Sequence, residues 1–269
     1  MYGAIIGDLA GSIYEFSQIR KVSTININNI IEDNSFYSDD TILTIAILDA
    51  MIGDKNFSMS LKQYGLKYLD YRPNYSPYFK TSFSPGFIKW LKQEDTGYST
   101  GNGAMMRISS IGYLATTMEE VEKYSYLATI PSHNTKEAID CAMLVSKIIF
   151  LARNNYTKEE IVAYLNIKLE YKPFTKFNAT CYDTIGNCLY ALFKANSFEE
   201  AIKEVISYGG DTDTNACIVG SMAEALYGIN KELIDKANSK LPKEFIDKLT
   251  LGYNIINTKS SPKIKRVLK

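Results

Sequence analysis

The sequence has few of the residues that bind zinc. It contains one histidine, and its four cysteines form no CxxC pair: Cys141, Cys181, Cys188 and Cys217. Zinc sites draw on clusters of these two residue types, so the sequence argues against a zinc site. Each cysteine falls in an apolar helical pattern, where a free thiol behaves as a small hydrophobe. We therefore expect a reduced, cytoplasmic setting.

Net charge and long apolar runs are also absent. Thirty basic residues balance thirty acidic ones, so no overall field attracts nucleic acid or anionic lipid, and nucleic acid is not expected as the main partner. No uncharged apolar run approaches the ~20 residues of a membrane helix. Asp8 and Glu15 interrupt the apolar N-terminal segment, which therefore does not resemble a signal peptide. The basic cluster at 259–269 is expected to be a flexible tail.

What the chain has instead is a series of helical patterns. Its 269 residues suffice for one large core, and no repeat or low-complexity linker divides it. Apolar periodicity predicts helices with short connections over most of the chain. The expected helical segments are 2–16, 38–53, 58–70, 107–116, 135–152, 157–170, 178–195, 198–207, 212–228 and 231–250. We expect one all-α domain spanning residues 1–269, in a monomer.

Two oxygen-rich segments open predicted helices: Ser38-Asp39-Asp40, and Gly209-Gly210-Asp211-Thr212-Asp213-Thr214. Helix capping alone explains each of them, because Ser, Thr and Asp side chains accept hydrogen bonds from the first amides of a helix. If the two segments converge, however, four carboxylates crowd one site, and like charges at that range require cations. Two Mg²⁺ or Mn²⁺ ions would neutralise them, because hard divalent cations prefer oxygen ligands.

The N-terminal helix carries an unusual face. Gly3, Gly7, Gly11 and Glu15 are spaced by four and therefore lie along one side of it. Each glycine costs about 1 kcal/mol relative to alanine inside a helix. Close approach of another helix or of a ligand is expected to offset that cost. Glu15 at the end of this stripe is either a site residue or the solvated end of a buried helix.

Three loops are of interest, and residues 22–36 are expected to form a fourth, irregular one. Residues 71–86 are rich in aromatics and prolines and form either a wall over a substrate or a loop that packs its own aromatics. The Gly101-Asn102-Gly103 turn precedes a helix and could cradle a phosphate with free amides. His133, at the predicted entrance of helix 135–152, is either structural or part of a site.

In this order, the motifs resemble those of the ADP-ribosylglycohydrolase family, which includes the dinitrogenase-reductase-activating glycohydrolase and the mammalian ADP-ribosylhydrolases. The matching segments are Gly7-Asp8 with Gly11-Ser12-Ile13-Tyr14-Glu15, Ser38-Asp39-Asp40-Thr41, Gly101-Asn102-Gly103-Ala104-Met105-Met106-Arg107, Ser132-His133-Asn134 and Gly209-Gly210-Asp211-Thr212-Asp213-Thr214. The resemblance runs from residue 3 to about residue 228. It implies a compact orthogonal helical bundle with a dinuclear magnesium or manganese centre.

The resemblance also implies roles for individual residues. The implied metal ligands are Ser38, Asp39, Asp40, Asp211, Asp213 and Thr214. The implied substrate-binding residues are Gly101, Asn102, Gly103, Ala104 and Met105, which hold the diphosphate, and His133 on the same side of the cleft. Glu15 is implied to lie near the scissile bond, where it and Asp213 assist proton transfer.

The activity implied by the resemblance is metal-dependent hydrolysis of the glycosidic bond between ADP-ribose and a modified arginine or serine side chain, or a related conjugate. Residues 83–86 match the corresponding family loop only loosely, which leaves the leaving group open. Two other functions stay open: a non-catalytic ADP-ribose-binding protein on the same scaffold, and a metal-dependent nucleotide phosphohydrolase.

Overall fold

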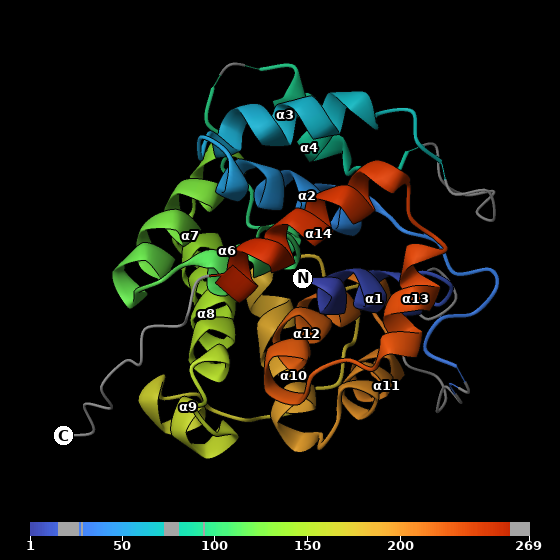
Figure 1. Ribbon diagram of the computed structural model, residues 1–269, viewed down its shortest axis with the longest axis vertical. Helices are drawn as coiled ribbons and strands as arrows, with labels where there is room; N and C mark the ends of the chain where they lie inside the picture. The colour runs from blue at the N-terminus through green and yellow to red at the C-terminus, as the bar shows by residue number, and fades with distance from the viewer. Residues whose placement is uncertain (16–26, 28, 73–80, 94, 259–269) are drawn as a thin grey trace.

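The computed structural model describes residues 1–15, 27, 29–72, 81–93 and 95–258, and within them the chain is all-α, as predicted (Figure 1). The helices are α1 (Tyr2–Gly11), α2 (Asp39–Ile52), α3 (Phe57–Lys67), α4 (Pro85–Leu91), α5 (Gly103–Met106), α6 (Ser109–Leu114), α7 (Met118–His133), α8 (Lys136–Arg153), α9 (Lys158–Tyr164), α10 (Cys181–Lys194), α11 (Phe198–Ser207), α12 (Thr212–Tyr227), α13 (Lys231–Asn238) and α14 (Lys243–Thr258). The predicted tail 259–269 and parts of loops 22–36 and 71–86 lie outside the described residues. No described helix has the length and apolarity needed to cross a membrane.

Helices α1, α2 and α12 form the centre of the molecule. Residues 3–11 of α1, 40–48 of α2 and 212–223 of α12 are buried without interruption. A helix that is apolar on all sides has no face suited to water, so the other helices must surround it. Figure 1 shows α3 and α4 above α2, with α7 and α8 on one side and α11 and α13 on the other.

The predicted glycine stripe allows α1 to lie directly against α12. A β-carbon added at Gly3, Gly7 or Gly11 would lie 2.1, 2.0 and 2.2 Å from the carbonyl oxygens of Gly220, Ala216 and Thr212, respectively. No side chain fits at those distances, so the two backbones touch along most of α1. The expected close approach is therefore made by a helix.

Several helix ends differ from the predictions. Helix α1 ends at Gly11, so Glu15 lies on the following turn rather than on the helical stripe. The unpredicted α7 fills much of the segment between residues 116 and 135, and His133 is its last residue rather than the start of α8. Residues 231–250, which were expected to add further turns, contain α13 and the first part of α14, separated by a break that contains Pro242, because proline cannot continue a helix.

Other helix ends agree with the predictions. Ser38 caps α2 by accepting a hydrogen bond from the Asp40 amide at 3.2 Å. Gly53 ends α2, and Gly228 ends α12 with a φ of 73°, a conformation that favours glycine.

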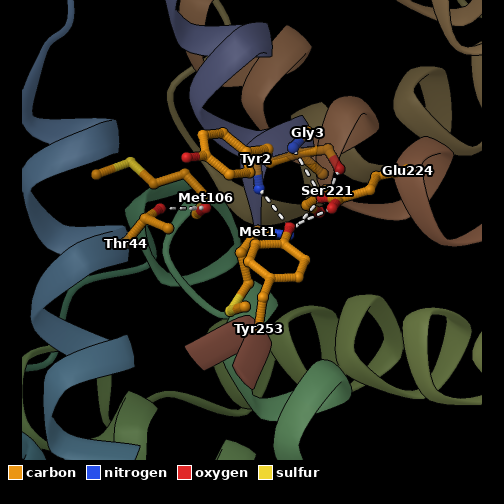
Figure 2. A network of polar contacts seen from close by, with 9 residues as sticks. Met1, Tyr2, Gly3, Thr44, Met106, Ser221, Glu224 and Tyr253 are labelled. Atoms are coloured by element: carbon orange, nitrogen blue, oxygen red, sulfur yellow. Dashed lines mark hydrogen bonds and ion pairs between the residues drawn. The ribbon is translucent and has the colours of Figure 1, made fainter. Parts of the chain in front are cut away.

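A polar network joins α1, α12 and α14 at the N-terminal end of α1 (Figure 2). The Glu224 carboxylate of α12 pairs with the buried Met1 ammonium, accepts a hydrogen bond from the Gly3 amide at 2.7 Å and accepts another from the Tyr253 hydroxyl. The Tyr2 amide donates to that same hydroxyl at 3.0 Å. Burial lowers the pKa of the ammonium, whereas Glu224 raises it. The network holds the end of the α1–α12 pair that lies away from the carboxylate cluster described next.

Candidate metal centre and cleft

Carboxylates from three helices meet at one end of the central core. Asp8 of α1, Asp40 of α2 and Asp213 of α12 each place a carboxylate oxygen within 4.8 Å of the others. A second group, under the same distance limit, consists of Glu15, Asp211 and Asp213. The two oxygen-rich segments singled out in the sequence therefore converge, and Asp213 belongs to both groups.

Asp8 is a member of this site that motif reasoning did not propose as a ligand. Its carboxylate accepts hydrogen bonds from the amide and hydroxyl of Ser38, both at 2.9 Å, and from the amide and hydroxyl of Thr41, at 3.1 and 2.6 Å. These four bonds attach α1 to the start of α2. The sequence did contain a signal for Asp8: it is a charged residue in the middle of an otherwise apolar helix, and such a group is almost never buried without partners.

Hydroxyl groups link the carboxylates to one another. The Ser38 hydroxyl lies 3.2 Å from Asp40 Oδ2, and the Thr214 hydroxyl donates to the same oxygen at 3.3 Å. The Thr214 amide donates to Asp213 Oδ1 at 2.9 Å. The starts of α2 and α12 are thus connected through Asp40.

Burial and mutual repulsion raise the pKa of every carboxyl in the cluster. Burial is the larger cause: it raises the pKa of Asp8 to about 7 and that of Glu15 to about 12, with repulsion from Asp213 adding to both. The same causes raise the pKa values of Asp39 and Asp40 well above the ordinary value, and for Asp213 burial is followed by repulsion from Asp211. Without a counter-charge, these groups cannot all be ionised at neutral pH.

The donor set fits a hard divalent cation. Asp40 Oδ1 and Glu15 Oε2 are buried and have no hydrogen-bond partner among the described residues. An unpaired buried carboxylate oxygen is costly, and oxygen-only surroundings are the kind that Mg²⁺ or Mn²⁺ occupies. Asp39, Asp211 and the Thr214 hydroxyl lie on the same wall of the site.

Unlike Asp8, five of these carboxylates line a cleft of about 360 Å³: Glu15, Asp39, Asp40, Asp211 and Asp213. Nearly all of the residues proposed from the sequence line it: Glu15, Ser38, Asp39, Asp40, Gly101, Asn102, Gly103, His133, Asp211, Asp213 and Thr214. They come from segments far apart in the chain, which the central helices bring together.

Ala104 and Met105, the other two residues predicted to hold the diphosphate, are not among the residues that line the cleft. Both are fully buried within α5, and the Met105 amide is bonded to the Asn102 carbonyl at 2.8 Å. The expected row of free amides is also only partly present: the amides of Gly101 and Asn102 donate to the Ser99 hydroxyl and the Ala179 carbonyl, each at 3.0 Å. The turn therefore offers fewer free donors than its sequence suggests.

The side chain of Asn102 points to the metal site. Its amide nitrogen donates to Asp211 Oδ2 at 2.7 Å, so it orients a carboxylate of the cluster. Asn178, which the sequence did not single out, accepts a hydrogen bond from the Asp211 amide at 2.8 Å. A β-carbon at Gly210, where φ is 76°, would lie 2.0 Å from Asn178 Oδ1. Glycine is therefore required at this turn.

Three aromatic side chains form a wall of the cleft. Phe83 and Phe87 stack with ring centroids 5.3 Å apart, and Trp90 packs on Phe87 at the same centroid separation. All three line the cleft, and Ser84 caps α4, which carries two of them. The described part of the predicted aromatic loop 71–86 therefore contributes to the wall of the cleft and contains the start of α4.

Comparison with known proteins identifies relatives of the whole chain. A family model described as ADP-ribosylglycohydrolase matches residues 1–260. An ADP-ribosylarginine hydrolase, Tri1, from Pseudomonas putida (strain GB-1) is 24% identical, with 95% of this chain and 74% of that protein covered. The ADP-ribosylhydrolase ARH3 of Homo sapiens is 19% identical, with 85% and 84% covered. A solved chain titled "ADP-ribosylglycohydrolase-related protein complex" superposes with a TM-score of 0.67 at 16% identity, over 95% of this chain and 92% of that chain.

Proposed function

The chain belongs to the ADP-ribosylglycohydrolase family, and from that premise we propose that it is a metal-dependent hydrolase that releases ADP-ribose from a modified protein side chain. The observation that carries the proposal is the cluster of buried carboxylates with unpartnered oxygens at the floor of the cleft. A protein that only bound ADP-ribose would have little use for a protonatable Glu15 beside such a cluster.

We propose arginine as the modified side chain, with serine as the alternative to be tested beside it. A relative matched over 95% of this chain is named as an ADP-ribosylarginine hydrolase. The aromatic wall of Phe83, Phe87 and Trp90 supports the same choice, because aromatic faces attract cations such as a guanidinium group.

Two Mg²⁺ or Mn²⁺ ions would be held by Asp39, Asp40, Asp211 and Asp213 with the Ser38 and Thr214 hydroxyls, and Asp8 would hold Ser38 and Thr41 in place at the start of α2. When bound, they would supply positive charge that neutralises the carboxylates and Lewis acidity toward water and the ribose hydroxyls.

Glu15 is the proposed proton carrier. Burial raises the pKa of its carboxyl group, so a protonated Glu15 can give its proton to the departing side-chain nitrogen as the bond to the anomeric carbon breaks. Water adds to that carbon and returns a proton to Glu15, so the products are ADP-ribose and the unmodified arginine. Asp213 lies in the same carboxylate group as Glu15 and can relay this one proton from the attacking water to Glu15.

Product analysis with single variants tests the proposal. Purified protein is incubated with arginine-linked or serine-linked ADP-ribosyl peptides, with Mg²⁺, with Mn²⁺ or with EDTA. We expect free ADP-ribose from the wild type in the presence of metal, and loss of metal binding and turnover in Asp211→Ala and Asp213→Ala with an unchanged helical circular dichroism spectrum.

Asp247→Ala is the matched control, because Asp247 is exposed and pairs only with Lys243 on α14. Release of AMP would indicate a phosphohydrolase instead, and binding without any product would indicate a non-catalytic member. EDTA-insensitive turnover in the Asp211 or Asp213 variants would contradict the proposed metal dependence.

A further inference from the structure

Arg107, which follows α5, is fully buried yet lines the cleft. Its Nη2 donates to the Ser132 hydroxyl at 2.7 Å and lies 3.3 Å from His133 Nδ1. The Ser132 hydroxyl is 2.8 Å from the same ring nitrogen. Nε and Nη1 of Arg107 have no hydrogen-bond partner among the described residues. A guanidinium group without a bonded carboxylate leaves positive charge at this side of the cleft.

The contacts at Nδ1 determine which nitrogen of His133 carries the proton. A serine hydroxyl can donate or accept, so Ser132 alone would allow either tautomer. A guanidinium nitrogen can only donate, so a protonated Nδ1 would leave its 3.3 Å contact with Arg107 Nη2 as donor against donor. An unprotonated Nδ1 can accept from both Arg107 and Ser132, and this arrangement places the proton of a neutral imidazole on Nε2.

Nε2 faces the glycine turn of the cleft. A β-carbon added at Gly101 or Gly103 would lie 3.5 or 3.6 Å from it, respectively. The amides of Gly101 and Asn102 are already bonded to other residues. An N–H group on Nε2 is consequently one of the few free donors that this turn presents to a ligand.

The surroundings also keep the imidazole neutral. Burial and the charge of Arg107 lower the pKa of His133 well below 6.5. Burial lowers the pKa of Arg107 to about 10, against the opposing effects of Cys181 and Asp39, which raise it. Arg107 therefore stays charged at neutral pH, and a second cation beside it is disfavoured.

We propose that Arg107 is a positioning residue that holds His133 as the neutral Nε2–H tautomer, so that the imidazole presents a fixed hydrogen-bond donor to an anionic oxygen of the ligand. The assignment of the proton rests on the geometry alone. The identity of the anion, a diphosphate oxygen of ADP-ribose, rests on the proposed function.

The chain's single histidine makes the tautomer directly measurable. A long-range proton–nitrogen correlation spectrum of histidine-labelled protein contains one imidazole, and its Hδ2 correlates strongly only with Nε2. In the wild type at neutral pH, we expect Nε2 at a pyrrole-type shift and Nδ1 at a pyridine-type shift. A protonated Nδ1, or an imidazolium pattern, would overturn the proposal without any assay of activity.

Arg107→Met removes the donor and keeps most of the side-chain length. We expect loss of the unique Nε2–H pattern, a pKa closer to 6.5 and about tenfold weaker ADP-ribose binding, which corresponds to one hydrogen bond to a charged group. Arg107→Lys, which can still donate, should restore the pattern. Ser132→Ala should keep it, because the guanidinium is sufficient.

Arg153→Met is the matched control: Arg153 is also largely buried, donates to the Gly112 and Tyr113 carbonyls and does not line the cleft. The His133 imidazole spectrum of the Arg153→Met variant should equal that of the wild type. An unchanged tautomer and affinity in Arg107→Met would overturn the proposal. If Arg107→Met does not fold, the wild-type and Ser132→Ala spectra test the proposal, and loss of the Nε2–H pattern in either would overturn it. Failure to hydrolyse ADP-ribosyl peptides with an intact Nε2–H pattern would count against the proposed function alone.

Discussion

At the scale of single residues, Asn102 orients a carboxylate of the candidate metal site through its side-chain amide. Its amide holds Asp211 Oδ2 at 2.7 Å, while its own backbone amide is tied to Ala179. A carboxylate oriented in this way loses less freedom when it binds a cation, and such outer contacts contribute substantially to affinity.

Asn102→Ala should weaken Mg²⁺ or Mn²⁺ binding about 10- to 100-fold, as removal of a group that orients a metal ligand does in other proteins. Isothermal titration of the metal-free protein measures the change. Asn56→Ala is the control, because Asn56 only caps α3; it should cost about 1 kcal/mol of stability and leave the affinity unchanged. Equal affinities for Asn102→Ala and the wild type would show that Asp211 needs no such support.

The raised pKa of Asp8 makes metal stabilisation depend on pH. An aspartate titrates near 3.8 when unfolded and at about 7 in this fold, so the folded state holds more protons between these values. Stability of the metal-free protein therefore falls as pH rises through this window. Asp39, Asp40 and Asp213 shift in the same direction.

We expect the rise in melting temperature on adding Mg²⁺ to be larger at pH 8 than at pH 6, because protons compete with the cation at the lower pH. Thermal unfolding at both values, with Mg²⁺ and with EDTA, measures the difference. The lowered pKa of His133 makes stability rise with pH below 6.5, the opposite direction. This contribution largely cancels when the melting temperatures with Mg²⁺ and with EDTA are compared at the same pH. Equal increments at pH 6 and pH 8 would contradict the assignment of these carboxylates as the binding site.

Sequence motifs could identify the carboxylates near residues 38–40 and 211–213, because two oxygen-rich helix starts that converge bring like charges together, which helix capping alone does not explain. Asp8 and Arg107 were harder to place. Each lies in or beside a helix whose neighbours are apolar, and only the tertiary packing shows that Asp8 joins the carboxylate cluster and that Arg107 lines the cleft. Short motifs alone also could not tell that Ala104 and Met105 turn away from it.

At the scale of elements, the α1–α12 contact sets the geometry of the site. Asp8 lies on α1 and Asp213 on α12, and the glycines keep the two helices close enough for the carboxylates to meet. A wider separation would move the carboxylates apart even though no ligand had been changed.

Gly7→Ala should destabilise the fold by about 3 kcal/mol, because a methyl group would press on the backbone of Ala216, which cannot rotate away. It should also weaken metal binding. Gly186→Ala is the matched control: Gly186 lies within α10 with nothing within 4 Å of an added β-carbon. Alanine there should stabilise by up to about 1 kcal/mol. Urea unfolding compares the two, and similar effects from both would contradict the close contact.

Helix ends were predictable where a glycine or a capping side chain marked them, as at Ser38, Gly53 and Gly228. Other ends depend on tertiary contacts. Helix α1 stops at Gly11, and the Ser12 hydroxyl accepts a hydrogen bond from the Phe36 amide at 3.2 Å. That contact joins residues far apart in the chain, so periodicity in residues 2–16 could not indicate where the helix ends.

At the scale of the whole molecule, the site joins the two ends of the sequence. Asp8, Glu15 and Asp40 come from the first part of the chain, whereas Asp211 and Asp213 come from the last third. Any unfolding that separates α1 from α12 therefore also disassembles the site.

Urea unfolding should be one transition, with and without metal, as expected for a single domain. Trp90 is the chain's one tryptophan and lies in the cleft wall, so its fluorescence reports on the cleft while circular dichroism reports on all helices. The two curves should coincide, and added Mg²⁺ should shift both to higher urea together. A fluorescence change at lower urea than the loss of helix would indicate that the wall unfolds separately.

The glycine stripe has a consequence for how a saturation-mutagenesis map of this protein should be read. Replacements at Gly3, Gly7 and Gly11 are expected to be tolerated as poorly as replacements of the carboxylates, although none of these glycines lines the cleft. Growth or activity scores alone would therefore merge two kinds of intolerant position. Protein abundance separates them: variants of the stripe lose folded protein, whereas variants of the carboxylates accumulate normally and lose turnover.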